Sequence, residues 1–141
     1  MKSIAEIRNG LAQMTGSEAY HRLSPLHGRM LCTDGTAWLA EAADCFWLFD
    51  IIASYQPQCA KDKDLRDFQV WTLTCEPAPE GKMRKATVKC ERDTGDRNPI
   101  VQEIPLTVPL TDFPLDSIKL YVEPGECGGK PVMVCLLPCE H

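Results

Sequence analysis

The chain has 141 residues, of which 44% are hydrophobic and 25% are charged, a composition that excludes wholesale disorder and fibrous repeats. A domain of this length buries roughly two-thirds of the surface of its unfolded chain, so we expect one domain over residues 1–141. Fifteen Lys and Arg against 20 Asp and Glu give a net charge of −5, which repels phosphate backbones and argues against a nucleic-acid partner.

The N-terminal segment does not resemble a signal peptide, because Ile4, Ile7 and Leu11 are separated by polar residues. The most apolar segment, residues 45–53, is far shorter than the roughly 20 residues of a spanning helix and contains Asp50. We therefore expect a cytoplasmic protein without a membrane anchor.

The first predicted element is a short amphipathic helix. Ser3 and Glu6 form a capping box, in which the Ser3 hydroxyl accepts a hydrogen bond from the Glu6 amide and the Glu6 carboxylate returns to the Ser3 amide. The residues of its apolar stripe are Ile4, Ile7, Leu11 and Met14. Gly16 follows the stripe and ends the helix.

Two short strands are expected next, at residues 18–23 and 30–32. The segment Thr33-Asp34-Gly35-Thr36 then signals a helix start, with Asp34 or Thr36 as the capping residue. We expect that helix to run from residue 37 to about residue 55, before Pro57. Residues 59–67 carry charges of both signs and are expected to be a solvated connector.

The second half of the chain shows the period of two that is typical of strands. The predicted strands are residues 68–75, 83–92, 100–106, 117–123 and 132–137. Short turns between successive strands predict an antiparallel meander. Pro105 and Pro109 place their strand at an edge or a bulge, whereas residues 132–137, apolar on both faces, indicate a central strand.

These elements predict an α+β fold: one domain with a mainly antiparallel sheet of about five strands, packed by two helices from the N-terminal half. In the hairpin of residues 117–137 the alternation also predicts the orientation of side chains. The residues expected to face the helices are Ile118, Leu120 and Val122, and those expected to point away are Lys119, Tyr121 and Glu123.

Four motifs recur in one order along the chain: TDG at 33–35, WLFDIIAS at 47–54, FQVW at 68–71 and TDFPL at 111–115. With these motifs the chain resembles a small uncharacterised group of bacterial and phage-borne domains of unknown function. The resemblance implies an intact single domain and a prokaryotic or viral setting. It implies no activity, ligand or catalytic residue, and the cysteines are not part of the pattern.

Eight cysteines would suggest four disulfides in a secreted chain, but without an export signal we expect reduced thiols. Cys45, Cys75, Cys90 and Cys135 fall in helical or strand-like runs, where a free cysteine packs as a small hydrophobe. Thiol titration of the denatured protein is therefore expected to find eight thiols.

The C-terminal cysteines are the candidate metal ligands. Four Cys and His side chains suffice for a tetrahedral zinc site, and Cys127, Cys135, Cys139 and His141 are near one another in sequence. There is no C-x₂-C knuckle among them, so packed or exposed thiols are the favoured interpretation. We expect no metal and no other cofactor.

One hypothesis for Cys32 is that its thiol is a catalytic nucleophile. His21 and His27 could act as its base, and Asp34 could orient that base. No family signature surrounds Cys32, so a buried or unreactive cysteine is the alternative.

Asp50 occupies an unusual position for a carboxylate. If residues 37–55 form one helix, about 100° per residue puts Asp50 near the middle of an apolar arc with Leu39 and Phe46. An ionised, unpaired carboxylate is too costly there, so we expect Asp50 to be hydrogen-bonded to buried donors or protonated. It would then either fix how the helix docks or act as a general acid or base.

Two functions remain. The first is a binding module that is carried by a phage or mobile element and acts through contact with a host protein. A homo-oligomer that covers the edge strand also stays open. The second is a small cysteine- or carboxylate-dependent enzyme. A pocket with two convergent titratable groups would favour the enzyme, and an apolar surface without them would favour the module.

Overall fold

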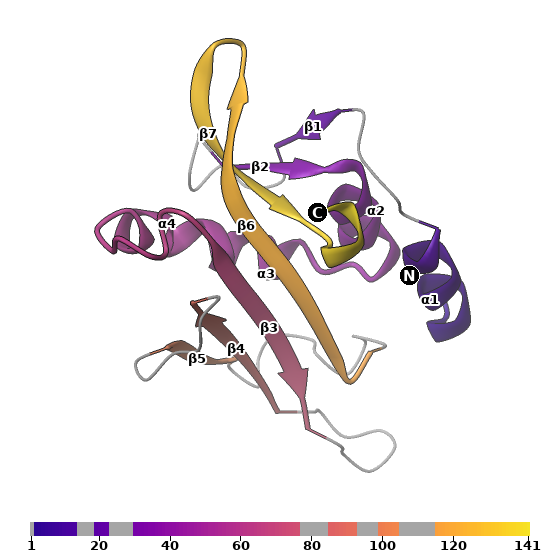
Figure 1. Ribbon diagram of the computed structural model, residues 1–141. Helices are drawn as coiled ribbons and strands as arrows, with labels where there is room; N and C mark the ends of the chain where they lie inside the picture. Colours follow the sequence, from indigo (N-terminus) through magenta and orange to yellow (C-terminus); the bar gives the residue numbers. More distant parts are fainter. Residues whose placement is uncertain (1, 14–18, 23–29, 77–84, 93–98, 105–114) are drawn as a thin grey trace.

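A computed structural model describes residues 2–13, 19–22, 30–76, 85–92, 99–104 and 115–141 (Figure 1). The helices are α1 (Ile4–Ala12), α2 (Asp34–Ala42), α3 (Phe46–Ser54), α4 (Gln56–Cys59) and the 3-10 helix η2 (Pro138–Glu140). The strands are β1 (Tyr20–His21), β2 (Met30–Thr33), β3 (Gln69–Cys75), β4 (Ala86–Glu91), β5 (Ile100–Ile104), β6 (Ser117–Cys127) and β7 (Lys130–Leu136). Among the described residues, no helix has the length and hydropathy needed to cross a membrane.

The strands form one seven-stranded sheet in the order β1-β2-β7-β6-β3-β4-β5. The α+β class is confirmed, but the sheet is mixed, because β2 and β7 run parallel while the other described neighbours are antiparallel. All five strands expected after residue 67 are present. The prediction of about five strands omitted β1 and β2 from the sheet, although both segments were expected to be extended.

The expected antiparallel neighbours are present for β3, β4 and β5 and for the hairpin of β6 and β7, but the meander is broken between β5 and β6. β6 pairs with β3 on the side opposite β4, and so it does not lie beside β5. The connection from Ile104 to Ser117 is long enough to cross two strands, whereas a short turn would have enforced a hairpin. β5 is an edge strand as predicted, and the interior position of β7 is confirmed; Pro105 and Pro109 lie outside the described residues.

One face of the sheet carries the core. α3 passes behind β6 and β3 in the view of Figure 1, and its Phe49 belongs to the same buried cluster as Trp71 and Leu120. The predicted alternation in β6 is confirmed: its inward residues are buried, whereas Lys119 is exposed and Tyr121 is partly buried.

The first helix begins as predicted. The Ser3 hydroxyl accepts a hydrogen bond from the Glu6 amide at 3.2 Å, and it also donates to the Glu6 carboxylate at 3.0 Å. The second bond differs from the expected return of the carboxylate to the Ser3 amide. α1 packs closely on α2, because a Cβ on Gly10 would lie 2.1 Å from Cη2 of Trp38. Glycine is therefore required at the crossing of the two helices.

The long helix expected at residues 37–55 is wrong: it is two helices. α2 begins at Asp34, and its cap is Thr33, whose hydroxyl accepts from the Thr36 amide at 3.4 Å. It ends in a Schellman motif, in which Asp44 adopts a left-handed φ of 50° and the Cys45 amide donates to Ala40 O at 3.0 Å. Aspartate tolerates this conformation better than most residues, and the chain turns there before α3 begins.

Candidate functional site

A hairpin projects from the sheet in Figure 1. β3 pairs with β6 as far as Val122, but β6 and β7 continue to pair with each other as far as Cys127 and Lys130. Gly128 and Gly129 close the hairpin with φ of 61° and 76°, the positive values that a type I′ turn requires. We call residues 124–133 the hairpin arm.

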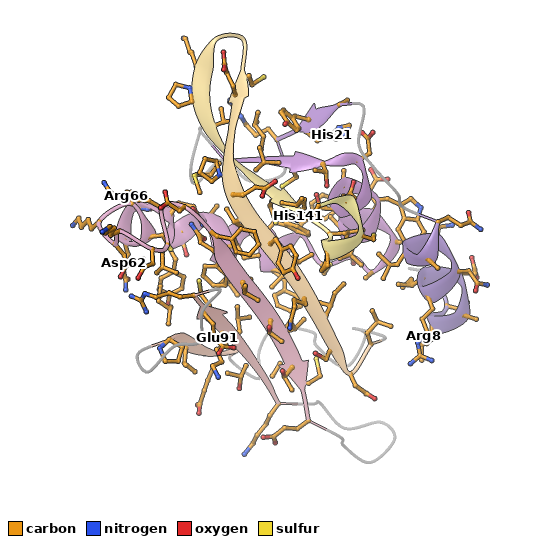
Figure 2. All side chains as sticks on the ribbon, viewed as in Figure 1. Arg8, His21, Asp62, Arg66, Glu91 and His141 are labelled. Carbon is orange, nitrogen blue, oxygen red and sulfur yellow. The ribbon has the colours of Figure 1, made fainter. Side chains whose placement is uncertain are left out.

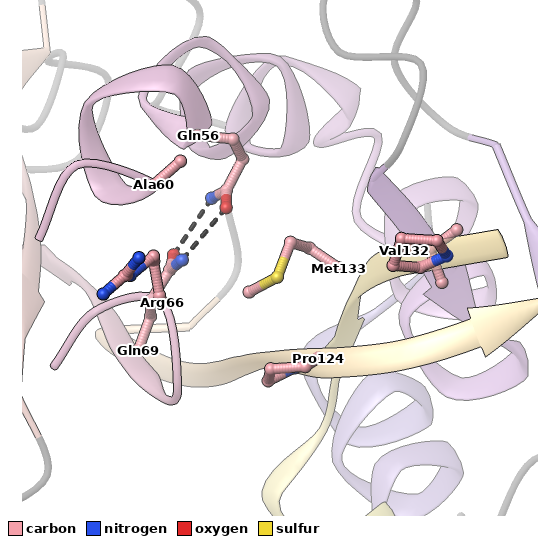
Figure 3. Close-up of a pocket in the computed structure, with 8 residues that line it drawn as sticks. Gln56, Ala60, Arg66, Gln69, Pro124, Val132 and Met133 are labelled. Carbon is pink, nitrogen blue, oxygen red and sulfur yellow. Dashed lines mark hydrogen bonds between the residues drawn. The ribbon is translucent and has the colours of Figure 1, made fainter. Parts of the chain in front are cut away.

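A cleft of about 310 Å³ lies between the hairpin arm and α4 (Figure 3). The arm contributes Pro124, Pro131, Val132 and Met133. The opposite wall consists of Gln56, Ala60, Arg66 and Gln69. The cleft therefore joins an apolar wall to a wall that carries two amides and one guanidinium group, from segments far apart in the sequence.

The two amides form a closed, buried pair. Gln56 Nε2 donates to Gln69 Oε1 and Gln69 Nε2 donates to Gln56 Oε1, each at 3.0 Å (Figure 3). The remaining NH₂ hydrogens go to Ile52 O at 3.0 Å and Leu65 O at 3.1 Å. Trp71 Nε1 also donates to Gln69 Oε1, at 2.8 Å. All four NH₂ hydrogens are used, so the amide pair is preorganised and offers a ligand no donor of its own.

The connector that carries Arg66 is held to the sheet. Arg92, just after β4, donates to Asp62, whose Oδ1 also accepts from the amides of Asp64 and Leu65 at 2.9 and 3.1 Å. Arg92 Nε lies 3.8 Å from a carboxylate oxygen of Asp64. Most residues of the connector are exposed, as expected, but Asp62 and Asp64 also tie it to the sheet through Arg92. Arg66 is exposed, and no carboxylate in the described part of the chain pairs with it; Figure 2 shows it at the α4 end of the molecule.

The Asp62–Arg92 pair predicts a measurable response to acid. The hydrogen bond from Arg92 is the main cause that lowers the pKa of Asp62 from 3.8 to about 2. Because the folded-state pKa is the lower one, this stabilisation is complete above pH 3.8 and is lost as the pH falls toward 2. Asp62→Asn should therefore flatten the fall in unfolding free energy across that window, measured by urea unfolding at several pH values. The exposed Asp67→Asn serves as control, and equal slopes for the two variants would contradict the assignment.

The proposed Cys32 nucleophile lies in the core. Cys32 on β2 is in register with Cys135 on β7, and both are buried. The hydrogen bond between the two thiols and burial raise the pKa of Cys135 well above its ordinary value. His21 and Asp34 do meet, with Nε2 and Oδ1 2.6 Å apart, but no described hydrogen bond joins Cys32 to His21. His27 lies outside the described residues.

The candidate metal ligands lie in different places. Cys135 is opposite Val122 in the core, whereas Cys127 is five residues further along β6, roughly 17 Å away at about 3.4 Å per residue. Cys139 is exposed on η2, and its thiol donates to Leu11 O at 3.8 Å. His141 Nε2 lies 3.0 Å from Oε2 of Glu123. In the residues that the structure describes, no three Cys, His, Asp or Glu side chains are grouped to hold a metal ion.

Asp50 is not in the middle of a buried arc. Because the helix restarts at Phe46, the helical wheel drawn from Leu39 does not extend to Asp50. The buried residues of α3 are Leu48, Phe49, Ile52 and Ala53, and Asp50 is only partly buried. None of the described side chains is hydrogen-bonded to it. The prediction that Asp50 is a carboxylate in the middle of a buried helix face is therefore wrong.

A second pair of buried thiols joins α4 to the sheet. Cys59 on α4 and Cys90 on β4 share a hydrogen bond that lowers the pKa of Cys59, although burial acts in the opposite direction. The four cysteines expected to be packed, Cys45 among them, are all buried, and burial raises the pKa of Cys45 to about 12. These thiols act as small core side chains.

The eight thiols should fall into two classes by their rate of reaction with a thiol reagent. Cys127 and Cys139 are exposed and the other six are buried. Titration of the native protein with an aromatic disulfide reagent should modify two thiols quickly, and the denatured protein should show eight. Cys139 should be slowed more strongly by low pH, because partial burial and the Glu140 carboxylate raise its pKa. Fast reaction of a third thiol in the native protein would show that the described core is wrong.

Sequence reasoning missed the Gln56–Gln69 pair. Its signal was present, because Gln69 falls in phase with the buried positions Trp71, Leu73 and Cys75 of β3. A polar residue at a core position indicates a buried hydrogen-bond network. The place of Arg66 in the cleft lining had no local signal, since a charged residue in a charged connector looks like solvated surface.

The expected membership of a family without assigned function can be tested against known proteins. No curated protein and no solved structure matches the chain. A family model matches residues 5–141, which is nearly the full length. The chain therefore belongs to the DUF6876 family, a family of unknown function.

Proposed function

We propose that this protein is a non-enzymatic binding module that holds a partner protein in the cleft between α4 and the hairpin arm. The observation that carries the proposal is the makeup of the cleft. Its lining is apolar apart from Arg66 and two amides, and those amides already bond each other. A pocket of this kind has the volume of a ligand site, but the described residues that line it include no general acid, general base or nucleophile.

The form of the hairpin arm supports the same proposal. An isolated two-stranded hairpin is only marginally stable in water, yet this one extends beyond its neighbouring strands with exposed Pro124 and Pro131. Proline lacks an amide donor and so discourages edge-to-edge pairing. An arm protected in this way is suited to selective contact through its side chains.

The alternative of a small cysteine- or carboxylate-dependent enzyme has less support. Cys32 is buried against Cys135, and Asp50 is partly buried and forms no ion pair with a described side chain. We also propose a cytoplasmic location and a phage or mobile-element setting, which rest on the N-terminal pattern and on the motif resemblance.

The proposal is tested by a capture experiment with matched charge variants. Immobilised wild-type protein, Arg66→Glu and Lys63→Glu are incubated with lysate of cells that carry the gene. Lys63 is exposed on the same connector but does not line the cleft, so both variants change the charge equally. Wild type and Lys63→Glu should retain the same partner, identified by mass spectrometry, and Arg66→Glu should lose it. Equal retention by all three proteins would contradict the proposal.

A second copy of the chain is the competing partner. Sedimentation velocity of the wild type across a hundredfold concentration range separates the two cases. A constant monomer mass supports a different protein as partner. A dimer that Arg66→Glu dissociates would mean that the cleft joins two copies.

A further inference from the structure

The size of the cleft limits what can enter it. At about 310 Å³ it lies at the lower end of the range for ligand pockets, about 300 to 1,000 Å³. Such a volume holds one apolar side chain and its own backbone groups, and it is too small for a helix or a strand of several residues. The wall of Val132 and Met133, facing Ala60, offers apolar contact over this length.

The positive charge of the cleft favours a ligand with a negatively charged group. Arg66 is the one ionisable residue of the described lining. The two acidic side chains nearest in sequence on its N-terminal side, Asp62 and Asp64, are both engaged by Arg92. The Arg66 guanidinium thus remains available for a carboxylate, which it can bind through two parallel hydrogen bonds.

The hydrogen bonding of Gln56 and Gln69 limits how a ligand can be oriented in the cleft. A chain that passed through the cleft would bury backbone amides and carbonyls on both sides of the inserted residue. The NH₂ hydrogens of Gln56 and Gln69 are all committed, so the backbone carbonyls of such a chain would find only the Arg66 guanidinium as a side-chain donor on this wall. A chain end avoids most of this cost, because its carboxylate can face Arg66 at the rim.

We infer that the cleft takes the C-terminal residue of a partner protein, with its apolar side chain against Met133 and Val132 and its terminal carboxylate on Arg66. This inference rests on the proposed function and names the part of the partner that binds. A C-terminal leucine, methionine or phenylalanine carries both recognised groups on one Cα atom, which matches a cleft in which the apolar wall and Arg66 line the same small volume.

The test is a nuclear magnetic resonance titration of the full-length, ¹⁵N-labelled protein. The probes are an acetylated pentapeptide that ends in leucine with a free carboxyl group, the same peptide as its C-terminal amide, and a free-acid peptide that ends in serine. The reporters are the side-chain NH₂ signals of Gln56 and Gln69, which line the cleft, and the indole NH of Trp71, which donates to Gln69 behind it. The leucine free acid should shift these signals, and the amide and serine peptides should bind about tenfold more weakly.

Matched variants assign the effect to the cleft. Arg66→Glu should abolish the preference for the free acid, whereas Lys63→Glu should keep it. Equal binding of acid and amide at the cleft would overturn the inference and leave the proposed function standing. Absence of shifts at the three reporters with every peptide would also overturn it. Failure of the proposed function itself is recognised separately, by equal partner capture with wild type and Arg66→Glu.

Discussion

Replacing Gln69 by alanine should lower the free energy of unfolding by about 3 to 5 kcal/mol. Gln69 is fully buried on β3, and its side chain makes bonds to Gln56, Leu65 and Trp71. Its removal takes away both bonds that Gln56 makes to Gln69 and the acceptor of the Trp71 indole, although Gln56 still donates to Ile52 O, and it leaves a cavity between α4 and the sheet. Unsatisfied buried polar groups and cavities are the two costliest consequences of a core substitution.

Urea unfolding of the wild type, Gln69→Ala and Gln58→Ala measures this effect. Gln58 lies on α4 but is exposed, so its replacement should change stability by less than about 0.5 kcal/mol. The double variant Gln56→Ala with Gln69→Ala should lose less than the sum of the two single losses, because the orphaned partner is removed as well. A Gln69→Ala cost as small as that of Gln58→Ala would show that the buried amide pair does not form.

Replacing Glu140 by alanine should cost about 2 to 3 kcal/mol. The Glu140 carboxylate accepts from the Thr33 hydroxyl at 2.6 Å, the Gly35 amide at 3.1 Å and the Leu137 amide at 3.0 Å. It thus joins η2 to the first turn of α2, where a negative charge also complements the helix dipole. Its loss takes away the acceptor of three partly buried donors, of which only the Thr33 hydroxyl has another partner nearby, the Thr36 hydroxyl at 3.1 Å, and it releases the C-terminal segment.

The matched control is Glu126→Ala, since Glu126 is an exposed glutamate of the hairpin arm. Gly35→Ala provides an independent check, because a Cβ there would lie 2.5 Å from Oε1 of Glu140 and would displace the carboxylate. Both Glu140→Ala and Gly35→Ala should lower the urea midpoint, and Glu126→Ala should not. If Glu140→Ala unfolded at the wild-type midpoint, the described contact between η2 and α2 would be wrong.

Local patterns were sufficient for the elements whose side chains alternate between core and solvent. β6 illustrates this, because Ile118, Leu120 and Val122 are buried as their spacing predicts. The helix of residues 37–55 was predicted wrongly, since the apolar period continues through a left-handed residue at Asp44. A single φ value ended the helix, and the hydrophobic pattern does not encode that value.

Local sequence patterns cannot predict which strands pair when the strands are far apart in the sequence. β2 and β7 are separated by about a hundred residues and run parallel, with Cys32 beside Cys135. No turn connects them, so no turn chemistry could indicate their register. The same reason explains why β6 was expected beside β5 instead of β3.

The candidate site was harder to predict than the fold. The cleft brings together residues 56–69 and 124–133, which meet only after the sheet has formed. Gln69 could have been singled out as a polar residue at a core position. Arg66 could not, because its proposed role depends on the pairing of the nearby Asp62 and Asp64 with Arg92, a residue at the end of another strand.

Site-specific photo-crosslinking tests the binding cleft most directly. A benzophenone amino acid is placed at Ala60, an exposed residue of the cleft wall, or at Val101, an exposed residue of the edge strand β5. The two proteins are irradiated in cells that carry the gene, and the crosslinked products are identified by mass spectrometry. We predict one protein partner crosslinked from position 60, through its C-terminal peptide, and none from position 101. Crosslinks from position 101 with none from position 60 would contradict the assignment of the cleft as the binding site.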